Sequence, residues 1–212
     1  MLATVDALLP LSLLEAVRNV DTPSDQFDAE YVDELRNKRF GLSDTVYAQI
    51  KRHTEAVRRR QRIGQDEAIA LAKLIGRRPD AEAVFRAAGR YMGRESYLTI
   101  SAVTRKMMRL LPSAVVRPLA YRRARKIASR YLNGNVRRVG SFLLLEVPRS
   151  IMVGTAPGTI GCAYYEASLR ELLLLSIGSI GAVEHVRCAG RGEGTCEWRA
   201  DWRSFDRNAG ME

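Results

Sequence analysis

The chain has 212 residues, of which 46% are hydrophobic, and its formal net charge is +10. This length and composition suffice for one generous domain or two small ones with a core that needs no disulfide support. The three cysteines are an odd number clustered in one region, which argues against a secreted disulfide framework and for free thiols. We therefore expect a globular protein in a reducing compartment, the cytoplasm.

The sequence contains no convincing membrane span. Residues 1–20 are apolar but contain Asp6 and Glu15, are interrupted by Pro10 and lack a basic leader, so they are a poor signal peptide. The longest apolar stretch elsewhere, residues 172–183, falls well short of the roughly 20 residues needed to cross a bilayer. We expect no transmembrane segment.

The first 40 residues predict one or two short helices around an acidic, proline-containing connection. Within them, Phe27, Tyr31 and Leu35 have the spacing of a buried helical stripe. We expect this segment to pack on the main body of the protein.

Three more helices are predicted before residue 95. Ser43–Asp44 makes a good N-cap for a helix over residues 45–62. Shorter helices follow over residues 66–76 and 79–92. His53 lies on the first of these helices, far in sequence from any catalytic partner, and is expected at the surface.

The pattern changes from helix to strand near residue 136. Helices are predicted over residues 98–111 and 118–132, and Asn133–Asn135 is a strong stop signal. Residues 136–147 then form a short run rich in β-forming side chains, ended by Pro148.

The C-terminal third predicts one buried helix and a hairpin. Residues 160–177 form a helix that is apolar over much of its circumference. Strands follow over residues 183–188 and 196–202, joined by the glycine-rich loop 189–195. That loop does not open a helix, so it is not a dinucleotide-binding motif.

These elements predict an α+β fold, with N-terminal helices packed on a small antiparallel sheet, a long buried helix and a C-terminal hairpin. We divide the chain into an N-terminal helical part (1–95), a ligand-binding core (96–205) and a polar tail (206–212). The three parts are expected to form one integrated domain.

All three cysteines and one of the two histidines fall within one window of 35 residues. Cys162 is expected near the start of the buried helix, and His185, Cys188 and Cys196 around the hairpin. Three thiolates and an imidazole match a closed, four-coordinate structural zinc site. The alternative is three ordinary buried cysteines beside a hydrogen-bonded histidine.

Gly161–Cys162, residues 184–190 (Glu-His-Val-Arg-Cys-Ala-Gly) and residues 194–198 (Gly-Thr-Cys-Glu-Trp) resemble the 4-vinyl-reductase domain family. The family includes bacteriochlorophyll 4-vinyl-reductase-type proteins and the sensor domains of phenol-responsive sigma-54 activators. Its fold is related to small TRAPP subunits and haem–nitric-oxide sensor domains. The resemblance covers residues 136–202.

The resemblance implies a structural zinc held by three cysteines and an acidic residue. The three cysteines fit Cys162, Cys188 and Cys196 by spacing, while the acidic position falls on His185. Glu184 directly precedes His185, so both remain candidates for the fourth ligand.

The resemblance also implies a homodimer and an apolar ligand cavity between the buried helix and the sheet. Phe142, Leu144, Tyr165 and Leu169 are the candidate lining for a hydrophobic or aromatic small molecule. Ordinary core packing is the alternative for each of them.

Charge is distributed unevenly along the chain. Residues 96–145 contain eleven Lys or Arg and no acidic residue, whereas acidic residues gather between residues 21 and 34. An anionic partner surface is therefore predicted on the helix 118–132, at Arg122, Arg125, Lys126 and Arg130. A protein partner is favoured over nucleic acid, because no nucleic-acid-binding motif accompanies these residues.

No Ser-His-Asp or paired-carboxylate arrangement can be placed, so an enzyme is not favoured. The leading hypothesis is a zinc-stabilised ligand-binding or sensory domain that acts through a partner or through dimerisation. The alternatives are an accessory or carrier protein in tetrapyrrole metabolism and a basic-faced adaptor for protein or nucleic acid.

Overall fold

The computed structural model describes residues 3–21, 43–111, 113–178 and 181–201, so the predicted stripe of Phe27, Tyr31 and Leu35 lies outside it. The fold is mixed α+β, as predicted: seven α-helices and two small antiparallel sheets occur in the described residues. None of the described helices has the length and apolar character that a membrane crossing requires.

The N-terminal region contains a two-stranded sheet that the sequence did not predict. Strand β1 (Thr4–Asp6) pairs antiparallel with β2 (Arg62–Gly64) over three residue pairs. Helices α1 (Leu8–Asp21) and α3 (Ser43–Arg58) flank these strands. Strands this short carry almost no alternating pattern, which explains why they escaped prediction.

The middle of the chain is helical, with boundaries that differ from the prediction. Its helices are α4 (Gln65–Ile75), α5 (Ala81–Leu98), α6 (Ala102–Leu110) and α7 (Ser113–Tyr131). Helix α5 runs six residues beyond its predicted end because Ser96 and Tyr97 continue its buried face. Pro118 lies inside α7 rather than at its start.

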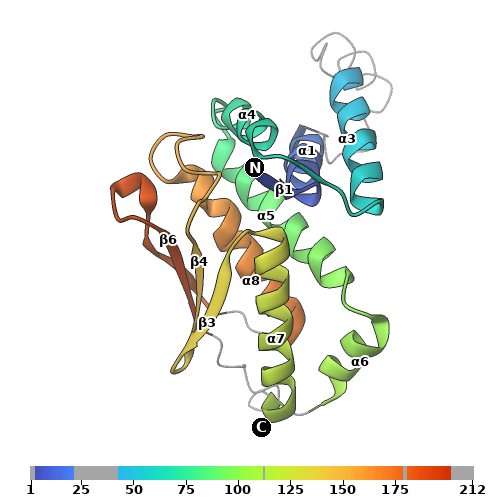
Figure 1. Ribbon diagram of the computed structural model, residues 1–212, viewed down its shortest axis with the longest axis vertical. Coiled ribbons are helices and arrows are strands. Elements are labelled where there is room, and N and C mark those ends of the chain that lie inside the picture. Colours follow the sequence, from blue (N-terminus) through green and yellow to red (C-terminus); the bar gives the residue numbers. More distant parts are fainter. Residues whose placement is uncertain (1–2, 22–42, 112, 179–180, 202–212) are drawn as a thin grey trace, which may run out of the picture.

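A four-stranded antiparallel sheet forms one layer of the molecule (Figure 1). Its strands, in spatial order, are β3 (Asn135–Val139), β4 (Phe142–Val147), β6 (Cys196–Asp201) and β5 (Val183–Arg187). The predicted single run 136–147 is a hairpin, because Gly140 turns the chain with a positive φ of 57°.

Helix α8 (Ala163–Ile177) is buried as predicted and occupies the middle of the molecule, behind the sheet and α7 in Figure 1. A 3₁₀ turn (Ile160–Cys162) precedes it. One face of the sheet packs against this helix and is almost solvent-free; its side chains are Leu143, Leu145, Val147, Cys196, Trp198 and Ala200.

Helices α5 and α8 pack against each other through glycines of α5. A Cβ atom on Gly89 would lie 2.2 Å from the Tyr164 carbonyl oxygen, and one on Gly93 would lie 2.8 Å from the Glu171 Cβ. The division drawn at residue 95 therefore runs through a helix that packs along the buried helix. Residues from both parts belong to one hydrophobic core.

His53 is buried, with 2% of its surface exposed, which corrects the prediction of a surface histidine. Its Nε2 lies 3.6 Å from the Glu67 carboxylate. Burial, together with the charge of Arg52, lowers the pKa of His53, while Glu67 opposes this shift. The imidazole therefore stays neutral in the folded protein at neutral pH.

We expect His53 to make the protein less stable as the pH falls below about 6.5, the ordinary histidine pKa. Below that pH the unfolded chain binds a proton at His53 that the folded chain does not, so the free energy of unfolding decreases. Urea unfolding at about pH 7.5 and about pH 5.5 measures this loss. His53→Gln should reduce it, and an equal loss in both proteins would contradict the assignment.

Candidate metal centre

The structure brings together all four predicted metal ligands. Cys162 ends the 3₁₀ turn at the N-terminus of α8, His185 lies on β5, Cys188 directly follows β5, and Cys196 begins β6. Their ligand atoms all lie within 4.8 Å of one another. Residues from three elements thus converge at one corner of the sheet.

The sulfur atoms have a spacing suited to a shared metal ion. The Sγ atoms of Cys162 and Cys188 are 4.0 Å apart, and all three cysteines are free. A disulfide would need about 2.05 Å, whereas tetrahedral ligands at about 2.3 Å from a metal lie about 3.8 Å apart. All three cysteines are buried, so water does not reach the cluster freely.

His185 is held in position by stacking. Its ring lies parallel to the Trp198 indole, with centroids 4.7 Å apart and an interplanar angle of 7°. Within the described part of the chain, its buried Nε2 has no hydrogen-bond partner. A buried ring nitrogen without a partner is costly, and coordination of a metal ion removes that cost.

The cluster already favours a thiolate. A hydrogen bond from Cys162 is the largest cause that lowers the pKa of Cys196, and the nearby His185 ring lowers this pKa further. The Ala189 N–H also donates to the Cys196 sulfur at 3.4 Å. The same hydrogen bond to Cys196, followed by burial, raises the pKa of Cys162. Thiolate is the form that ligates metal, so Cys196 is ready to bind, and Cys162 must release a proton when it does.

A loop contact that the sequence did not reveal supports Cys188. The Glu193 carboxylate accepts the Cys188 backbone N–H at 2.5 Å and the Arg191 guanidinium at 3.0 Å. The Cys188 N–H is the largest cause of the lowered Glu193 pKa. Gly192 and Gly194 have φ values of 81° and 82°, which allow the loop to fold back on itself. In the sequence, the only sign of this contact was a single acidic residue, Glu193, among the glycines of the loop.

Glu184 is not part of the cluster. It lies opposite Arg199 in the β5–β6 pairing and its carboxylate accepts the Arg199 guanidinium at 2.5 Å. Because side chains alternate along a strand, Glu184 and His185 project from opposite faces of the sheet. Of the two candidates for the fourth ligand, the geometry selects His185.

The four predicted cavity residues do not meet. Tyr165 and Leu169 are each 1% exposed in the core, and the Tyr165 ring packs 4.9 Å from Trp198. Phe142 and Leu144 instead project from the outer face of β4, where the Arg199 guanidinium lies 5.1 Å from the Phe142 ring. The sheet lies between the two pairs of residues. The prediction that all four line one cavity is therefore wrong.

The four predicted basic residues are also divided. Lys126 and Arg130 line a cavity beside α7, and Arg123, which was not singled out, lines it with them. Arg122 and Arg125 do not line this cavity, and the Arg125 guanidinium lies 5.8 Å from the Tyr121 ring. Only two of the four predicted basic residues therefore face this cavity.

Four protein ligands fill a tetrahedral coordination shell, which leaves no position for a substrate or a reactive water. A metal ion here would tie the start of α8 to the ends of β5 and β6. The arrangement therefore suits a structural metal. We compared the chain with models of protein families, with curated proteins and with solved structures, and none of the three comparisons found a match.

Proposed function

We propose that this protein is a zinc-stabilised, non-catalytic domain that binds a small molecule and has a regulatory role. The cluster of three buried cysteines, Cys162, Cys188 and Cys196, with the half-buried His185 is the observation that carries the structural part, because all four ligand atoms lie within 4.8 Å of one another. Three thiolates and one imidazole favour zinc over the harder cations calcium and magnesium, which take oxygen ligands. Free thiols of this kind belong in a reducing compartment such as the cytoplasm.

The small-molecule and regulatory parts rest on the resemblance of residues 136–202 to the 4-vinyl-reductase domain family. The α+β fold, with a buried α8 beside an antiparallel sheet, agrees with that resemblance. The same resemblance suggests a homodimer. In this proposal a bound molecule is reported through dimerisation or through a partner protein.

Native mass spectrometry of the full chain, purified without chelators, tests these parts together. We expect one zinc per chain, because the cluster is closed and buried, together with a dimer and a small-molecule adduct. Much less than one zinc per chain contradicts the metal assignment. A bound pigment would favour a carrier of tetrapyrroles over a sensor.

A further inference from the structure

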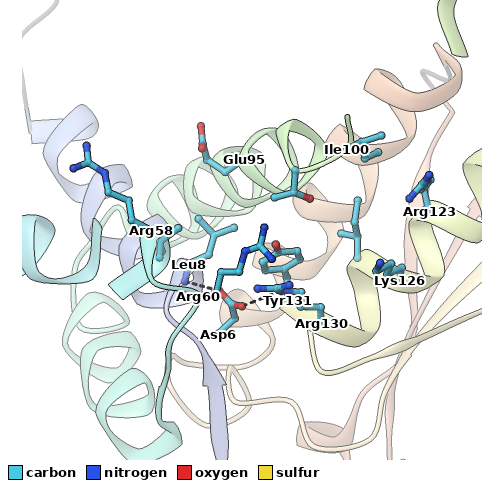
Figure 2. A pocket seen from close by; sticks show the side chains of 13 residues that line it. Asp6, Leu8, Arg58, Arg60, Glu95, Ile100, Arg123, Lys126, Arg130 and Tyr131 are labelled. Atoms are coloured by element: carbon cyan, nitrogen blue, oxygen red, sulfur yellow. Dashed lines mark hydrogen bonds and ion pairs between the residues drawn. The ribbon is translucent and has the colours of Figure 1, made fainter. Parts of the chain in front are cut away.

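A cavity of about 310 Å³ lies on the helical side of the molecule, and none of its lining residues belongs to the metal cluster. Its walls come from β1, the start of α1, the end of α3, the C-terminal part of α5 and the C-terminal half of α7 (Figure 2). The lining residues that matter below are Leu8, Arg60, Ile100, Arg123, Lys126 and Arg130.

The cavity collects positive charge. Five basic side chains line it, Arg58, Arg60, Arg123, Lys126 and Arg130, against only two carboxylates, Asp6 and Glu95.

One of those carboxylates is already engaged. Asp6 is 4% exposed, accepts the Leu8 N–H at 3.0 Å and pairs with Arg130 at 3.4 Å. Within the described part of the chain, no carboxylate pairs with Arg60, Arg123 or Lys126. Cations held together without partners repel one another, and an anion placed among them relieves that repulsion.

Arg60 occupies a backbone position that normally selects glycine. The Gln61 N–H bonds to the Ala56 carbonyl at 2.9 Å and the Arg60 N–H to the Val57 carbonyl at 2.9 Å, the Schellman pattern at the end of α3. Arg60 has a φ of 54° at this position. An arginine at this position makes the protein less stable than a glycine would. The local backbone therefore gives no reason for an arginine here.

The Arg60 side chain points into the cavity. Figure 2 shows it reaching from the end of α3 toward the middle of the cavity, near Arg130 and Tyr131. Arg123 and Lys126 lie at the other end, on α7. A ligand between these two ends would meet the Arg60 guanidinium, just after α3, and the Arg123 and Lys126 cations of α7.

Apart from Thr99, the uncharged part of the wall is made of apolar and aromatic side chains. Leu8, Ile100 and Ile127 line the cavity, and Tyr131 adds an aromatic ring with the Arg130 guanidinium 5.1 Å from its centre. The volume lies at the small end of the range for ligand pockets. The walls therefore suit one small molecule that has both an apolar body and a negative charge.

We propose that this cavity binds a soluble small molecule with an apolar body and a carboxylate or phosphate group, whose oxygens are held by Arg60 and by the α7 cations. The inference rests on the proposed small-molecule-binding function and names its site and ligand class. It does not depend on the zinc site.

Isothermal titration of the full chain with 1-naphthoate, 1-naphthyl phosphate and neutral 1-naphthalenemethanol tests the ligand class. We expect at least one of the anions to bind about tenfold more tightly than the alcohol, because charge-assisted hydrogen bonds form only with the anions. Equal affinity for all three would overturn the inference.

Two variants test the site. Arg60→Gly should weaken anion binding about tenfold while raising the denaturation midpoint, since glycine fits the left-handed position. Arg122→Ala removes the same charge from α7 outside the cavity and should change affinity less than about twofold. Equal weakening by both variants would mean a general charge effect and would overturn the inference.

The remaining outcomes separate this inference from the proposed function. If the alcohol binds and Arg60→Gly does not change its affinity, the small-molecule function would remain, but its site would lie outside this cavity. If the protein binds phosphatidylglycerol vesicles but neither soluble anion, the cavity would be a lipid-binding site. That result would overturn the inference of a soluble ligand. If no probe binds, the ligand inference fails, whereas the zinc content is measured independently.

Discussion

Cys188→Ser is expected to lose the bound zinc and to lower the free energy of unfolding by about 4 kcal/mol, the stabilisation given by a ligand present at about 1,000 times its dissociation constant. Cys188 is 1% exposed, and its Sγ lies 4.0 Å from that of Cys162. Serine nearly preserves the volume but offers a poor zinc ligand. Zinc content by elemental analysis and unfolding in urea measure the two effects.

The chelator dependence makes this prediction specific. A chelator should destabilise the parent protein to the level of Cys188→Ser and leave the variant almost unchanged, because both treatments remove the same interaction. If Cys188→Ser keeps the stability of the parent and neither responds to chelator, the cysteines are ordinary core residues.

Two neighbouring residues provide a matched control. His185→Gln removes a ligand and should lower zinc content, whereas Glu184→Gln removes only an exposed ion pair with Arg199. An exposed pair contributes about 1 kcal/mol or less, so Glu184→Gln should keep its zinc. The reverse result would mean that Glu184, and not His185, is the ligand.

Gly89→Ala is expected to destabilise the protein by about 3 kcal/mol, at the upper end of the usual cost of overpacking a core. A Cβ atom there would lie 2.2 Å from the Tyr164 carbonyl oxygen and 2.8 Å from the Ala167 Cβ. Both contacts are on α8, so α5 must move away from the buried helix. In an exposed helix the same change would stabilise the protein by up to about 1 kcal/mol. The close packing of α5 on α8 therefore turns a stabilising substitution into a destabilising one.

Gly64→Ala is the control for this prediction. Nothing in the described part of the chain lies within 4 Å of a Cβ placed on Gly64, and its φ is −59°, which alanine adopts readily. We expect its free energy of unfolding to stay within about 0.5 kcal/mol of the parent. If Gly89→Ala is as stable as Gly64→Ala, the close packing of α5 on α8 is contradicted. Zinc content should remain normal in both variants.

The metal cluster and most helices could be predicted from the sequence because their signals are local. Cys162, His185, Cys188 and Cys196 are rare residue types in one short window, and the strand and turn pattern around them places three of the four on a hairpin. Helix α8 was recognisable from its continuous apolar surface. Helix ends were less accurate, since burial of residues such as Tyr97 extends a helix beyond its capping signals.

The features that depend on distant partners could not be predicted. His53 lies on a helix with a basic sequence, yet neighbouring elements bury it. Phe142 and Leu144 are as apolar as Leu143 and Leu145, and a continuous apolar strand does not show which face will meet α8. The pairing of β4 with β6 settles that question by placing Leu145 opposite the buried Trp198.

The sequence by itself therefore determined the α+β class, the buried helix and the three cysteines of the metal cluster, and it narrowed the fourth ligand to His185 or Glu184. Only the tertiary structure separated Glu184 from His185, brought α5 close to α8 through Gly89, and gathered Arg60, Arg123 and Lys126 around one cavity. The physical reason is that residue type and local spacing specify chemistry and helix periodicity. Strand register and helix packing depend on contacts between residues far apart in the chain.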